Sequence, residues 1–213
     1  MTTQEQPSLR QPSLKSLALD VLRQRLVTGQ LRPGEIYSVS ALAVELGVSN
    51  SPVREAMLEL QNLGLVEAVR NRGFYVLSMS EEERVGVLEV RLMLEVPATA
   101  QLAGDPRLIA SLPHFRSLAQ EIMRAAREED IVAFLDADRR FHLGILELHG
   151  NQALVDTVGR LRDRTRLFAD KSAVLTSADE HLDILNALER GDGPASAELL
   201  TAHLRHVKDD WYI

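Results

Sequence analysis

The sequence contains no cysteine among its 213 residues. Disulfide bonds and thiolate metal sites are therefore excluded, which leaves histidine and carboxylate side chains as the only strong metal ligands. A chain without cysteine has no need of an oxidising compartment, and we expect to find it in the cytoplasm.

The sequence also lacks a long apolar run, so we expect no transmembrane helix and no membrane partner. Residues 1–12 are polar, include two prolines and have no apolar core of the signal-peptide kind. We expect them to form a disordered arm. Hydrophobic residues make up 45% of the sequence and charged residues 26%. These proportions are typical of a globular protein, and the length suffices for one large domain or two small ones.

An excess of positive charge is missing as well, because the formal net charge is -7. Residues 1–79 carry eight Lys or Arg against seven Asp or Glu, whereas residues 80–213 carry sixteen against twenty-four. The acidity thus belongs to the C-terminal part. A nearly neutral N-terminal part can still bind DNA if its cations cluster on one face, but its modest attraction to phosphate would require two copies.

Residues 41–73 carry two short helical patterns separated by a tight break. Apolar residues recur at helical spacing up to Gly47, a residue type that commonly ends a helix in the left-handed conformation. The period resumes at Val53 and continues to Leu60. This arrangement predicts a helix-turn-helix, in which the small Ala43 lets the two helices approach each other.

The second helix of this pair would present its first turn to solvent. Ser49 or Ser51 can cap the helix, and Pro52 is tolerated there because no backbone donor is lost. Asn50, Ser51 and Arg54 then offer short hydrogen-bonding groups and a forked cation, which are the groups that read base edges in DNA. The ordinary alternative for Arg54 is an ion pair with an acid on its own helix.

Two strand-like runs follow, over residues 65–69 and 73–77, and are joined by the basic segment Arg70-Asn71-Arg72-Gly73. They predict a β-hairpin with a basic tip. The hairpin would form the wing of a winged helix-turn-helix domain, which we expect to span residues 13–78.

The segment SNSPVREAMLELQNLGLVEAVRNRGFYV resembles the winged helix-turn-helix signature of the GntR family of bacterial transcription regulators. The resemblance implies that the second helix enters the major groove of double-stranded DNA and that the wing reaches the minor groove. The implied contacts are a base contact by Arg54, wing contacts by Arg72 and Gly73, and phosphate contacts by Ser40, Ser49 and Ser51. Many members have arginine where this chain has Asn50, so a DNA contact at that position would differ in strength or specificity.

The rest of the chain shows helical patterns only. One helix over residues 14–26 precedes the helix-turn-helix. The C-terminal helical stretches run over about residues 81–103, 106–128, 130–148, 151–169, 178–190 and 194–210. We expect residues 79–213 to form an all-α antiparallel bundle, so the fold class is mainly α with two domains.

Two of these helices have capping patterns at their starts. Ser80 precedes three consecutive glutamates, which favour the first turn of a helix. Ser177 and Glu180 have the spacing of a capping box, which predicts the start of the fifth C-terminal helix.

Four residues of the bundle have the spacing of a metal site. Asp138 and His142 are four apart, so one helical turn places both on the same face. His181 lies eleven residues before Asp192 in the last turn, and His203 lies eleven after it, so an antiparallel hairpin puts both imidazoles at the same height. Three imidazoles and one carboxylate suit a divalent ion, with zinc first and nickel, manganese and iron as alternatives.

Each residue of this set also has an ordinary alternative. Asp138 could be a surface acid beside Arg139 or Arg140. His206 shares a helix face with His203 and is the principal competitor for its place. We assign no ligand role to His206, His114 or His149.

The segments DADRRFH, HGN, EHLDILNALERGD and AELLTAHL resemble the C-terminal FCD domain of FadR-type GntR regulators. In metal-binding members of that group an aspartate, the histidine four residues later and two further histidines hold a divalent metal. The resemblance maps these ligands onto Asp138, His142, His181 and His203. It also implies an effector contact for Arg91, although an ion pair with Glu95 one turn away is an equal alternative.

These observations together predict a homodimeric transcription regulator, and the resemblance implies a repressor. Two copies would bind a palindromic operator, and a small carboxylate effector at the metal would change their affinity for DNA. Two alternatives stay open at this point. The chain could be a metal-dependent hydrolase with Glu180 as the base, or a regulator that senses the metal ion itself.

Overall fold

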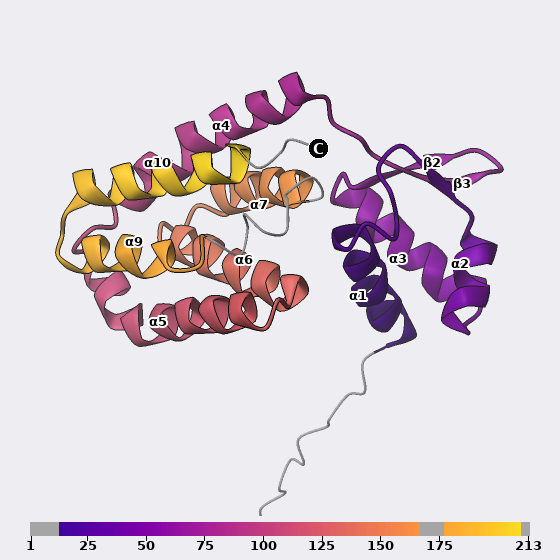
Figure 1. The fold of residues 1–213 in the computed structure, drawn as a ribbon, viewed down its shortest axis with the longest axis horizontal. Coiled ribbons are helices and arrows are strands. Elements are labelled where there is room, and N and C mark those ends of the chain that lie inside the picture. Colours follow the sequence, from indigo (N-terminus) through magenta and orange to yellow (C-terminus); the bar gives the residue numbers. More distant parts are fainter. Residues whose placement is uncertain (1–12, 167–176, 210–213) are drawn as a thin grey trace, which may run out of the picture. The chain divides into compact units, whose positions relative to one another are not determined.

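The computed structural model describes residues 13–166 and 177–209. This part of the chain forms two compact units (Figure 1). The first contains residues 13–26 and 30–77, and the second contains residues 27–29 and the chain from residue 78 onward. Residues 1–12, for which an arm is predicted, lie outside the described residues.

The N-terminal unit combines three helices with a small antiparallel sheet, as Figure 1 shows. The helices and strands are α1 (Leu14–Val27), β1 (Ile36–Tyr37), α2 (Val39–Leu46), α3 (Asn50–Asn62), β2 (Val66–Val69) and β3 (Gly73–Val76). The predicted helix-turn-helix is α2 and α3, and the predicted hairpin is β2 and β3. The winged helix-turn-helix fold is therefore confirmed.

The helix-turn-helix forms for the reasons that its sequence suggests. Gly47 ends α2 in the left-handed conformation at a φ of 66°, where a residue with a side chain would be strained. Val53 and Ala56 of α3 are fully buried, and Ala43 of α2 is buried as well. Ser49, one of the two predicted caps, is the N-cap of α3, but its side chain makes no capping hydrogen bond.

The sheet contains one strand that the sequence analysis did not predict. Its order is β1-β3-β2, with Tyr37 of β1 opposite Phe74 of β3. Two residues are too few for an alternating pattern, so β1 leaves no signal in the sequence. It nevertheless explains Gly73, because a Cβ atom built there would lie 2.1 Å from the carbonyl oxygen of Tyr37. Gly73 thus has a structural role as well as the predicted role at the wing tip.

The C-terminal unit is an antiparallel helical bundle (Figure 1). Its described helices are α4 (Glu81–Ala100), α5 (Pro106–Arg127), α6 (Ile131–Glu147), α7 (Gln152–Arg166), α9 (Glu180–Glu189) and α10 (Gly193–Asp209). They agree with the six predicted helical stretches to within a few residues, although the predicted end of the fourth stretch falls outside the described residues. The mainly α fold class is confirmed. None of the described helices is long and apolar enough to cross a membrane.

Of the two helix caps predicted for the bundle, the one at α4 is present and the one at α9 is not. Ser80 caps α4, and its exchange of hydrogen bonds with Glu83 forms a complete capping box. The capping box predicted for α9 is wrong. The N-cap of α9 is Asp179 without a side-chain cap, and the Glu180 carboxylate contacts two histidines of α10 instead.

The core of the bundle brings α6, α9 and α10 together. Phe134 and Phe141 of α6 are among the largest fully buried side chains. Their rings meet the imidazole of His181 edge-on, with centroids 6.5 and 5.1 Å away. Aromatic contacts of this kind fix the orientation of a buried ring. The packing of α6 thus orients the first residues of α9.

We expect Gly73→Ala to destabilise the N-terminal unit by about 1–3 kcal/mol more than Gly34→Ala does. Both glycines have positive φ, 130° and 86°, but a Cβ at position 34 meets nothing within 4 Å. Chemical unfolding followed by circular dichroism measures the difference. Equal destabilisation by the two substitutions would show that the approach of Tyr37 is not what requires glycine at position 73.

Candidate functional site

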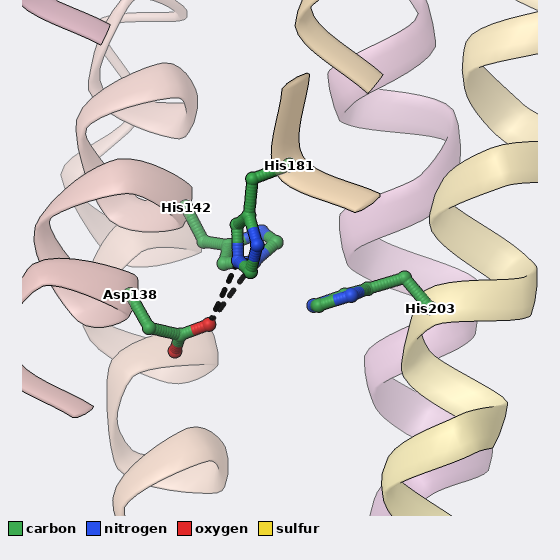
Figure 2. A group of neighbouring side chains, drawn as sticks. All are labelled: Asp138, His142, His181 and His203. Carbon is green, nitrogen blue, oxygen red and sulfur yellow. Dashed lines mark hydrogen bonds and ion pairs between the residues drawn. The ribbon is translucent and has the colours of Figure 1, made fainter. Parts of the chain in front are cut away.

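Four buried side chains from three helices meet inside the bundle (Figure 2). Asp138 and His142 come from α6, His181 from the first turn of α9 and His203 from α10. One potential ligand atom from each residue lies within 4.8 Å of the others. The structure therefore brings together the whole set of predicted metal ligands.

The distances among the ligand atoms of Asp138, His142 and His181 suit a small cation. The Nε2 atom of His181 lies 3.2 Å from Nε2 of His142 and 3.2 Å from Oδ1 of Asp138. The Nε2 atom of His142 lies 3.4 Å from the same carboxylate oxygen. Ligand atoms on a tetrahedral zinc ion are separated by about 3.3 Å when each lies about 2.0 Å from the metal.

Hydrogen bonds outside the cluster determine which ring nitrogens face inward. Nδ1 of His181 lies 3.1 Å from the carbonyl oxygen of Ala178, and Nδ1 of His203 lies 2.8 Å from Oε2 of Glu180. A neutral imidazole that donates through Nδ1 has its lone pair on Nε2. In that tautomer the lone pair of His181 points into the cluster, where it can bind a cation together with Oδ1 of Asp138. This donor set fits a divalent metal.

The protonation states agree with that fit. Burial is the largest influence on the pKa of His142 and lowers it well below its usual value, and the nearby Arg162 charge lowers it further. Burial also lowers the pKa of His203, despite its hydrogen bond to Glu180. Both rings are therefore neutral near pH 7, the form that binds metal.

Arg162 of α7 is a residue of the centre that the sequence analysis missed. It is only 3% exposed and donates through Nη2 to Oδ2 of Asp138 at 2.7 Å and through Nη1 to Oε2 of Glu95 at 2.6 Å. Burial alone would raise the pKa of Asp138, but the Arg162 charge and the neighbouring histidines hold it well below its usual value. The helical period could have revealed Arg162, because it continues the buried face of Val155 and Val158.

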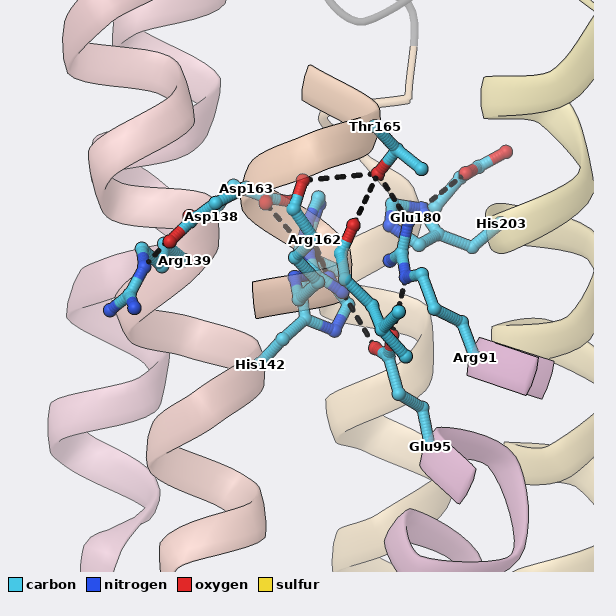
Figure 3. Close-up of polar contacts among 12 residues, drawn as sticks. Arg91, Glu95, Asp138, Arg139, His142, Arg162, Asp163, Thr165, Glu180 and His203 are labelled. Atoms are coloured by element: carbon cyan, nitrogen blue, oxygen red, sulfur yellow. Dashed lines mark hydrogen bonds and ion pairs between the residues drawn. The ribbon is translucent and has the colours of Figure 1, made fainter. Parts of the chain in front are cut away.

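Arg91 lies in the same buried network (Figure 3). Its Nε donates to Oε1 of Glu95 at 2.6 Å, and its Nη1 donates to the Thr165 hydroxyl at 3.3 Å. The ion pair with Glu95, which was the alternative for Arg91, is thus present. Glu95 joins Arg91 to Arg162 and, through Arg162, to the Asp138 carboxylate. The effector contact predicted for Arg91 stays a prediction.

The remaining histidines lie outside the ligand cluster. His206 is exposed, and its Nδ1 lies 2.5 Å from Oε1 of Glu180. Nε2 of His149 lies 2.6 Å from the carbonyl oxygen of Ala98, and the ring of His114 packs on Phe115. Glu180 accepts hydrogen bonds from His203 through Oε2 and from His206 through Oε1, so both of its carboxylate oxygens have a histidine partner.

The residues predicted to contact DNA are at the surface of the N-terminal unit. Ser40, Ser49, Asn50, Ser51, Arg54 and Arg72 are exposed, and Gly73 is partly exposed. The Ser51 hydroxyl donates to Oε1 of Glu55 at 3.0 Å, so it would have to turn away from Glu55 to reach a phosphate. Their contacts with DNA remain predictions.

Comparison with known proteins agrees with the two units. The profile of the GntR family of bacterial regulatory proteins matches residues 15–76, and the profile of the FCD domain matches residues 86–206. The HTH-type transcriptional regulator LutR of Bacillus subtilis is 32% identical over 208 residues, which cover 85% of this chain and 93% of LutR. The chain belongs to the GntR family and carries an FCD domain.

Other similarities support the same assignment for this GntR-family regulator. The HTH-type transcriptional repressor RspR of Escherichia coli is 27% identical over 214 residues, which cover 98% of this chain and 93% of RspR. The structure of E. coli McbR/YncC superposes with a TM-score of 0.71 at 22% identity, covering 91% of this chain and 94% of that one, and shares the fold. Since the family and these relatives are regulators, the chain is a regulator and not an enzyme, and the hydrolase alternative is wrong.

We expect Glu180→Gln to weaken metal binding by about 10–100-fold, because the amide orients His203 less well and lowers its basicity. Competition with a chromophoric zinc chelator measures the affinity. Glu189→Gln is the matched control on α9, since that carboxylate pairs with Arg116 at the surface. Similar zinc affinities of the two variants would exclude a supporting role for Glu180.

Proposed function

We propose that this GntR-family regulator is a cytoplasmic repressor whose operator affinity is controlled by a small carboxylate bound at a divalent metal, with zinc as the metal. Asp138, His142, His181 and His203 hold the metal. The observation that carries the proposal is the convergence of these four donors in the domain of a regulator that matches the FCD profile. RspR is named a repressor, which supports that direction of control.

The charges around the centre favour an anionic effector. With a divalent metal bound, the buried positive charges would be those of the metal, Arg91 and Arg162. The buried negative charges would be those of Asp138 and Glu95, so the net buried charge would be +2. The half-buried Glu180 offsets one of these charges. Uncompensated buried charge is costly, so a carboxylate that completes the coordination of the metal would be stabilised there.

Arg91 is the proposed contact for a second group of the effector. Its guanidinium is buried and pairs with Glu95, and burial, the largest influence, lowers its pKa. An effector carboxylate near Arg91 would compete with Glu95 for this cation. Because Glu95 also binds Arg162, such an exchange would alter the contacts between α4 and α7.

We further propose that the regulator binds its operator as a homodimer. The N-terminal heads would use Arg54 and Asn50 for bases, Arg72 and Gly73 at the wing, and Ser40, Ser49 and Ser51 for phosphates. One recognition helix contacts too few bases for useful specificity, whereas a two-fold dimer doubles the contacts. The FCD domain presents a suitable apolar face on α4, where Val90 and Met93 are 41% and 71% exposed.

Genomic footprinting followed by binding assays would test the control by metal and effector. We expect a carboxylate from the pathway encoded by the genes next to the operator to weaken binding of the zinc-loaded protein to the operator by tenfold or more. The variant His181→Ala with His203→Ala should lose the metal by elemental analysis, retain operator binding and lose this response. A response that persists without metal would contradict the proposal. Release of the protein from the operator by zinc alone would favour the alternative in which the regulator senses the metal ion itself.

Sedimentation of a variant with Val90→Asp and Met93→Asp would test the dimer. We expect it to sediment as a monomer and to bind the operator at least tenfold more weakly, because two buried carboxylates would oppose association. Ile109→Asp is the control, since Ile109 is an apolar residue on α5 that is about as exposed as Val90. A dimer that survives both substitutions would place the interface elsewhere.

A further inference from the structure

The first half of α3 exposes a small set of side chains in two rows. Asn50, Ser51, Arg54, Glu55 and Leu58 are exposed, whereas the residues between them are buried. Residues four apart lie above one another on a helix, so Asn50, Arg54 and Leu58 form one row, and Ser51 and Glu55 form the other.

The two rows differ in their free hydrogen-bonding groups. The Ser51 hydroxyl donates to the Glu55 carboxylate at 3.0 Å, so the second row is paired within the helix. Among the described residues, the side chains of Asn50 and Arg54 have no hydrogen-bond partner. The row that begins with Asn50 therefore has an unpaired amide and an unpaired guanidinium one helical turn apart.

These two groups match particular bases. An asparagine amide pairs bidentately with N6 and N7 of adenine, whereas a guanidinium pairs with O6 and N7 of guanine. Four residues of an α-helix rise about 6 Å, which is close to two steps of about 3.4 Å along a DNA strand. The spacing of the two side chains thus corresponds to bases about two positions apart.

We propose that Asn50 specifies an adenine in each operator half-site and that Arg54 specifies a guanine within about two base pairs of it. This inference rests on the proposed function, since it requires α3 to enter the major groove. Asn50 carries no charge and releases no counterion, so its contribution should appear as base preference and not as salt dependence.

Selection of duplexes from a randomised library by the full-length protein tests this assignment. The wild type should enrich a two-fold motif with an adenine and a guanine about two positions apart in each half. Asn50→Arg should replace the preference for that adenine by a preference for guanine, because the guanidinium matches a different base. Asn50→Ala should accept any base there and bind the selected duplex about tenfold more weakly.

Asn62→Arg is the matched control, because it makes the same substitution at the exposed far end of the same helix. It adds the same charge and should keep the adenine. Arg54→Lys keeps the charge but loses the fork, and should relax only the guanine. A two-fold motif that is unchanged in both Asn50 variants would overturn this inference and leave the proposed function standing. Failure to enrich any duplex would overturn both.

Discussion

The candidate centre depends on one carboxylate that is shared between two roles. Oδ1 of Asp138 faces His142 and His181, whereas Oδ2 accepts a hydrogen bond from Arg162 at 2.7 Å. The arginine thus offsets the cost of burying the carboxylate and leaves one oxygen directed at the metal position. Oδ1 also lies 3.4 Å from Nε2 of His142 and 3.2 Å from Nε2 of His181, so Arg162 and the two imidazoles together orient the carboxylate.

The same arginine joins the centre to the rest of the bundle. Through Glu95 it connects α6 and α7 to α4, where Arg91 completes a chain of alternating charges. Every member of this chain is buried, so each charge is stabilised mainly by its neighbours and not by water. A change at the metal that altered the partner of Asp138 would therefore favour a different arrangement of α4, and α4 is the helix that carries the exposed Val90 and Met93. In the proposed function, occupancy of the buried site would change the association of two copies by this route.

The sequence predicted the four residues of this centre but not the side chains that pack around them, and the reason is physical. The ligands of α6 follow from helical spacing, and those of α9 and α10 follow from their equal distance from a turn, so all four are local patterns. Arg162 meets Asp138 across two helices, and the identity of such a partner depends on how the helices pack. The capping box at Ser177 failed for the same reason, because Glu180 found partners on α10. The strand β1 was missed because two residues contain no period.

The division of charge between the two units also has a consequence for specificity. An N-terminal part with nearly equal numbers of cations and anions gains little from the general attraction to phosphate, so we expect it to bind arbitrary DNA weakly. The discrimination between operator and other sequences must then come from directed contacts, and the exposed face of α3 offers few of them. With the proposed contacts, a neutral amide at position 50 in place of a cation would lower non-specific affinity further while still offering two directed hydrogen bonds. For such a head, the proposed pairing of two copies would supply both affinity and specificity, and a sensor that acted on this pairing would be an effective control.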